Sequence, residues 1–121
     1  MRKLELEAKV IEIVNRAQNG QPTEDDYVEL KAKWPTPPEK IARQLAGSLN
    51  AARGEPVLWL IGVEEKTGIV QGVNYQDMPS WWDKVKAEFD GEVPLMVFKN
   101  VSINGTTVVA LHFESRPLPM L

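Results

Sequence analysis

The chain alternates between two apolar patterns, one with the spacing of helices and one with the two-residue spacing of strands. Residues 3–18 carry a single apolar stripe at helical spacing, formed by Leu6, Val10, Ile13, Val14 and Ala17. This spacing predicts an amphipathic helix. The Asn19-Gly20 pair, followed by Pro22, predicts that the helix ends there.

Residues 26–34, DYVELKAKW, alternate polar and apolar side chains, which predicts a strand. Alternate side chains of a strand share a face, so Glu29 and Lys31 are expected to be neighbours on one side of it. A carboxylate beside an ammonium fits either a solvated strand face or a site that handles phosphates.

The TPPE stretch at residues 36–39 predicts the start of a second helix. Thr36 is expected to be the N-cap, with prolines at the first two helical positions and Glu39 at the capping-box position. The helix is expected to run to about Arg53 and to stop at Gly54.

The remaining pattern predicts four strands and a third helix. The strands are expected at 57–63, 69–73, 95–103 and 106–113, and the helix at 79–89. The unbroken apolar run at 57–63 is typical of a central strand covered on both faces. Asn104-Gly105, between the last two runs, is a strong signal for a tight hairpin.

These elements predict one compact α+β domain over residues 1–121, with a mixed β-sheet and about three helices, in the order α-β-α-β-β-α-β-β. Residues 114–121, which include Pro117 and Pro119, are expected to begin a linker to downstream domains of a longer protein.

The composition of the chain excludes several kinds of functional site. The net charge is −3, there is no cysteine, and His112 is the one histidine, so disulfides, thiolate metal sites and thiol catalysis are excluded. The charge argues against a uniformly basic surface for nucleic acid but leaves a local basic groove open. No signal peptide or membrane-spanning run is predicted, and we expect a cytoplasmic protein without a membrane partner.

Acidic residues could turn the Glu29–Lys31 strand into a metal site. Glu24 precedes this strand, and Glu64 and Glu65 follow the apolar strand. If the two strands are neighbours, these carboxylates could converge at one sheet edge and hold Mg²⁺ or Mn²⁺ beside Lys31. The simpler interpretation is that each is a solvated surface charge.

Two tryptophans and the histidine could have either a functional or a structural role. Trp81 and Trp82 are adjacent on a predicted helix, so one of them is expected at the surface, where it would pack partially, meet a partner or stack on a base. His112 shares a strand face with Val108 and Ala110 and is expected to be structural or exposed at an edge.

Several short motifs also occur in a particular order. Glu29-Leu30-Lys31 is followed by the helix IARQLAGSLNAARGE and then by VLWLIGVEEKTGIVQGV, with its Gly62-Val63 pair. In this order, over residues 24–113, they resemble the Schlafen AlbA-type domain, a divergent Alba-like family.

The resemblance implies a domain that binds nucleic acid, either DNA or RNA, without needing a cofactor. It would form the N-terminal part of a larger bacterial-type regulatory or defence protein. The basic residues that we expect at the nucleic acid are Lys31, Lys33, Arg43, Arg53 and Lys66.

The resemblance also leaves a metal-dependent endoribonuclease open, since better-understood Schlafen proteins carry two glutamates and an aspartate. Here Glu24, Glu29 and Glu65 would hold Mg²⁺ or Mn²⁺, with Lys31 near the scissile phosphate. The third acid is a glutamate instead of an aspartate, and Arg53-Gly54 stands where the family has a double glycine.

A third alternative is a protein-interaction or dimerisation module that binds no nucleic acid. Its partner would cover Trp81, or a second copy would pair with an exposed edge of the hairpin.

Overall fold

The computed structural model describes residues 3–23 and 27–115. Its elements are, in chain order, α1 (Lys3–Gln18), β1 (Val28–Lys31), α2 (Pro38–Ala51), β2 (Val57–Ile61), the 3-10 helix η1 (Tyr75–Asp77), α3 (Met78–Lys86), β3 (Leu95–Ile103) and β4 (Thr106–Glu114). The prediction of an α+β domain with three α-helices and a mixed sheet is confirmed.

The four strands form one sheet in the order β1-β2-β4-β3. β1 and β2 are parallel, with α2 as the connection between them, whereas β4 is antiparallel to both β2 and β3. Because β1 and β2 run the same way, the segments that follow them leave the sheet at the same end.

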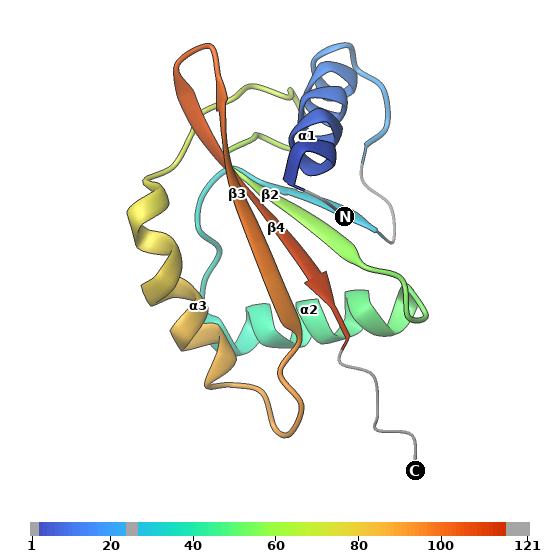
Figure 1. Cartoon of the computed structure of the whole chain (residues 1–121), viewed down its shortest axis with the longest axis vertical. Helices are drawn as coiled ribbons and strands as arrows, with labels where there is room; N and C mark the ends of the chain where they lie inside the picture. The colour runs from blue at the N-terminus through green and yellow to red at the C-terminus, as the bar shows by residue number, and fades with distance from the viewer. Residues whose placement is uncertain (1–2, 24–26, 116–121) are drawn as a thin grey trace.

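Helices cover the two faces of the sheet separately (Figure 1). α1 packs against Leu30, Leu58 and Leu60 on one face. α2 and α3 pack against Val57, Trp59 and Ile61 on the other. All five residues of β2 are therefore buried, as its continuous apolar run predicts.

The predicted strand at 69–73 is wrong. This segment contributes one isolated bridge, between Val63 and Val70, and turns at Gly72, which has a positive φ of 74°. The peptide N–H of Gly72 donates to the carbonyl of Gly62, and that of Val73 to the carbonyl of Thr107. The segment thus folds over the end of the sheet without extending it.

The start of α2 also differs from its prediction. The N-cap is Pro37 and not Thr36, with no side-chain hydrogen bond to the first turn. Proline fixes φ near the helical value, so this helix begins through backbone restriction in place of a capping side chain.

Both Trp81 and Trp82 are buried, at 7% and 8% exposure, so the expectation that one lies at the surface is wrong. Trp82 packs on Phe113 of β4, while Trp81 is covered by the segment that follows β1. The Trp81 indole N–H donates to the carbonyl of Pro35 at 2.8 Å. A helical wheel cannot show that a loop from elsewhere closes over the second face.

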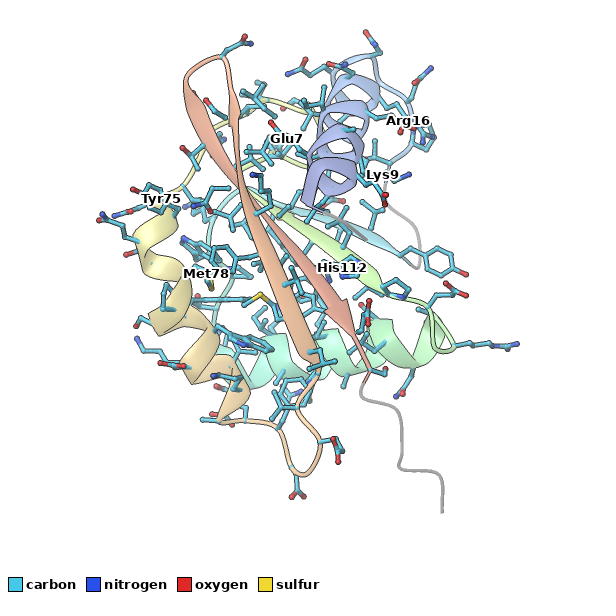
Figure 2. The ribbon with its side chains drawn as sticks, in the orientation of Figure 1. Glu7, Lys9, Arg16, Tyr75, Met78 and His112 are labelled. Atoms are coloured by element: carbon cyan, nitrogen blue, oxygen red, sulfur yellow. The ribbon has the colours of Figure 1, made fainter. Side chains whose placement is uncertain are left out.

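His112 is 6% exposed and lies on β4, an interior strand. The structural interpretation of this residue is confirmed, and exposure at an edge is excluded. Figure 2 shows it among the strands, away from the outer edge of β3. Among the described residues, none of the helices has the length and apolar character of a membrane span.

Candidate functional site

Glu29 and Lys31 lie on the α2 side of β1, as strand alternation predicts. The Lys31 ammonium Nζ is 3.4 Å from Oε1 of Glu29. Gln44 of α2 joins both, because its Oε1 accepts from Lys31 at 3.2 Å and its Nε2 donates to Glu29 Oε1 at 3.4 Å. The three side chains form a closed polar ring between the strand and the helix.

The ring is half-buried, and its charges largely satisfy one another. The Glu29 and Lys31 side chains are about a quarter exposed, and Lys31 Nζ also lies 5.7 Å from the centre of the Trp59 ring. A lysine held in this way is less available to a phosphate than a free one. The sequence gives no indication of this role for Gln44, because it is one of several polar residues beside the buried stripe of α2.

Glu65 and Lys66 lie in the turn after β2. They line a pocket of about 230 Å³ with Gln21, Pro22 and Thr23, on the segment between α1 and β1. Glu24 continues this segment and lies outside the described residues.

Glu64 organises that turn. Its Oε2 accepts from the peptide N–H groups of Lys66 and Thr67 and from the Thr67 hydroxyl. The hydrogen bonds from Thr67 lower the pKa of the Glu64 carboxyl. Glu64 is therefore a structural residue of the turn.

The described residues show no cluster of carboxylates at which a divalent cation would bind. Nowhere within 3–23 and 27–115 do three or more His, Asp or Glu side chains meet in a group that could hold a metal ion. Glu29 is committed to an ammonium and an amide N–H, which compete with a cation for the same oxygen. Mg²⁺ usually takes several oxygen ligands at about 2.1 Å. A magnesium site made by Glu24, Glu29 and Glu65 would therefore require a ligand from Glu24, which lies outside the described residues.

The basic residues do not all lie together. Lys33 is exposed just after β1 and Lys66 just after β2, at the same end of the two parallel strands. Arg53 precedes β2, at the opposite end. The 14-residue helix α2 lies between it and Lys33 in the chain and is about 20 Å long. Arg43 is exposed on α2 and shares a pocket with Glu39, Glu88 and Asp90.

A row of aromatic rings runs from the core to the Lys33 end of the molecule. Phe113 contacts Trp82 at 5.4 Å between ring centres, Trp82 contacts Trp81 at 6.1 Å, and Trp81 contacts Trp34 at 5.2 Å. Trp34 is half-buried, and its indole N–H donates to the carbonyl of Asn74. The row therefore ends in a fixed ring at the surface.

That ring lines a pocket of about 340 Å³ between the start of α2 and α3. Its walls are Trp34, Thr36, Pro38, Asp77, Ser80, Trp81 and Lys84. Sequence reasoning missed Trp34 and Lys84 as site residues, although the Lys33-Trp34 pair, a cation beside an aromatic ring, was a usable signal.

Comparison with known proteins identifies a fold and no family. No protein-family model and no curated protein matches the chain. Among solved structures, the DIP2311 protein from Corynebacterium diphtheriae matches over 96% of this chain with a TM-score of 0.54 and 22% identity. This chain spans 27% of that protein's length, so the likeness is one of fold over a quarter of a longer chain.

Proposed function

We propose that this domain binds single-stranded or unpaired nucleic acid at the pocket formed by Trp34 and Trp81. The observation that carries the proposal is the Trp34 ring, held at the surface by Trp81 behind it and flanked in sequence by exposed Lys33. Aromatic rings that accept bases, next to cations that follow the backbone, are the usual elements of single-strand recognition.

The polar lining of the pocket suits a base better than a phosphate. Asp77 contributes a carboxylate, which repels phosphate but can accept a hydrogen bond from an exocyclic amine. Lys84, on the same wall, and Lys33, next to Trp34, would then meet the phosphates on either side. A local site of this kind is compatible with a net charge of −3.

Within this proposal the predicted basic residues do not all have the same role. Lys33 belongs to the site, and Lys66 lies at the same end of the strands. Lys31 acts indirectly, because its ring with Glu29 and Gln44 fixes the strand from which Lys33 and Trp34 continue. Arg53 lies at the far end of the sheet and is not part of the site.

Metal-dependent cleavage of RNA is a separate hypothesis, which the donor set of the described residues does not favour. It predicts that Mn²⁺ and Glu29 are both needed for activity. Binding at the tryptophan pocket needs no metal, and Glu29 would affect it only indirectly, through the ring with Lys31 and Gln44 that positions β1.

One experiment separates these outcomes. Labelled single-stranded DNA, structured RNA and duplex DNA are incubated with the wild-type domain and Glu29→Ala, each in Mn²⁺ or EDTA, and run on native and denaturing gels. The proposal expects a shift with the single-stranded or structured probes in EDTA, without cleavage. Cleavage lost with either EDTA or Glu29→Ala would establish the nuclease instead, and the absence of any shift would refute nucleic-acid binding.

A further inference from the structure

β3 is an edge strand without the features that usually protect one. It pairs with β4 through nine consecutive residue pairs without a bulge, and no other strand of the described residues pairs with its outer side. Its one charged residue is Lys99, and it has no proline. Short length, bulges, prolines and charges are the means by which edge strands avoid pairing with other chains.

The other edge strand of the sheet, β1, has the protective features that β3 lacks. β1 has four residues, two of which are Glu29 and Lys31. A short, charged strand is a poor template for a partner. β3 is more than twice as long and exposes large apolar side chains at Leu95, Val97 and Phe98, each at least 40% accessible.

The hairpin determines which backbone groups of β3 face outward. Ile103 and Thr106 flank a two-residue turn with positive φ at Asn104 and Gly105, and such a flanking pair is hydrogen-bonded. Hydrogen-bonded pairs then alternate along the ladder. Accordingly, the Thr107 carbonyl, opposite Ser102, turns away from β3 and accepts from Val73.

The same alternation turns the N–H and C=O groups of Met96, Phe98, Asn100 and Ser102 away from β4. These groups form a continuous row of donors and acceptors along the outer edge. Phe98 is therefore at an outward position in its backbone and also exposed in its side chain.

We propose that β3 pairs antiparallel with β3 of a second copy of this chain, with the two-fold axis at Phe98, to form one continuous eight-stranded sheet. An isologous contact of this kind needs a surface that is complementary to itself. The open edge provides one, because each outward N–H meets an outward C=O of the other copy.

Charge selects the register. Full overlap of the two strands would place the axis at Lys99 and oppose the two ammonium groups, which is unfavourable. Moving the axis one residue, to Phe98, opposes Lys99 with Val97 and Leu95 with Val101, and pairs the two Phe98 residues. Seven residues of each strand, 95–101, remain paired.

Sedimentation equilibrium from low to high micromolar concentration tests the dimer directly. The wild type is expected to shift from the monomer mass of 13.6 kDa to twice that value. Asn100→Pro removes an outward N–H without touching the β4 ladder and is expected to remain monomeric, as is Phe98→Lys. Ile69→Lys, which changes an exposed apolar residue elsewhere, is expected to dimerise like the wild type.

A crosslinking measurement tests the register in a protein that keeps its fold, since the chain has no natural cysteine. Under oxidation Phe98→Cys should form a disulfide-linked dimer, because the two copies would lie about 5.5 Å apart at Cα. Ser102→Cys should not, since its copies would be about 26 Å apart along the sheet. A monomeric wild type, a dimer unaffected by Asn100→Pro and Phe98→Lys, or faster crosslinking at position 102 would each overturn the proposal.

Discussion

The Lys31 ammonium lies 3.4 Å from the Glu29 carboxylate, two residues earlier on β1, and Gln44 of α2 contacts both. The arrangement ties the edge strand to the helix that follows it. The loop between them carries Lys33 and Trp34, so the polar ring positions the candidate binding residues without needing to touch a ligand.

Replacing Gln44 tests this positioning role. Gln44→Ala removes two half-buried hydrogen bonds and is expected to lower the free energy of unfolding by about 1 kcal/mol. Arg43→Ala, an exposed change on the same helix, controls for helix propensity and should stay within about 0.5 kcal/mol of the wild type. Urea unfolding of the three proteins gives the comparison, and equal midpoints for the two variants would show that the ring has no structural role.

Gly68 is expected to be irreplaceable. It has a φ of +73°, and a Cβ there would come within 2.6 Å of the backbone of Ala17 and Gln18 at the end of α1. Gly68→Ala should destabilise the domain by about 2–4 kcal/mol, from the left-handed conformation and the overpacking together.

Gly47 on α2 provides the matched control, because a Cβ there would meet no atom within 4 Å. Gly47→Ala should stabilise by about 0.5–1 kcal/mol. Thermal unfolding monitored by circular dichroism measures both changes. A Gly68→Ala variant as stable as the wild type would mean that α1 does not pack closely on the turn after β2.

His112 should make stability depend on pH below neutrality. Burial lowers its pKa from the ordinary value of 6.5, and Glu114, 3.8 Å away, offsets only part of the effect. The unfolded chain therefore binds a proton near pH 6.5 that the folded chain does not, so stability is lost as the pH falls below that value.

The measurement for His112 is the urea midpoint at pH 7.5 and at pH 5.5. His112→Leu removes the titrating group and should show a smaller fall between the two conditions than the wild type. An equal fall in both proteins would assign the pH dependence to other groups.

Arg53 adopts a left-handed backbone conformation, with φ of 52°, in the turn between α2 and β2. Glycine tolerates this region without the steric penalty of a Cβ. Arg53→Gly is therefore expected to stabilise the domain by about 1 kcal/mol. Because Arg53 lies outside the proposed site, nucleic-acid affinity should change little. Chemical denaturation measures the change in the free energy of unfolding. A less stable Arg53→Gly variant would show that the backbone at Arg53 is not strained.

Much of the fold follows from local pattern. The apolar stripe of α1 and the Asn104-Gly105 turn each specify a structure through a period or a backbone conformation that few residues accept, and both predictions are confirmed. The all-apolar β2 likewise predicts its own burial on both faces.

The predictions that failed depended on contacts between distant segments. Whether residues 69–73 pair as a strand depends on Gly62 and Gly72 approaching each other, and the burial of Trp81 depends on Trp34 and Pro35 folding over it. Gln44 shows the same limit at the site, because its role appears only when β1 and α2 are adjacent.

Binding at the Trp34–Trp81 pocket can be measured by fluorescence anisotropy of a labelled single-stranded oligonucleotide, titrated with the domain at several salt concentrations. The variants are Lys33→Glu and Lys84→Glu, beside the Trp34–Trp81 pocket, with Arg53→Glu as the charge-matched control at the far end of the sheet. We expect the affinity to weaken with salt, to fall about tenfold or more for each lysine variant, and to change less than about threefold for Arg53→Glu. Equal losses at all three positions, or no binding by the wild type, would contradict binding at this pocket.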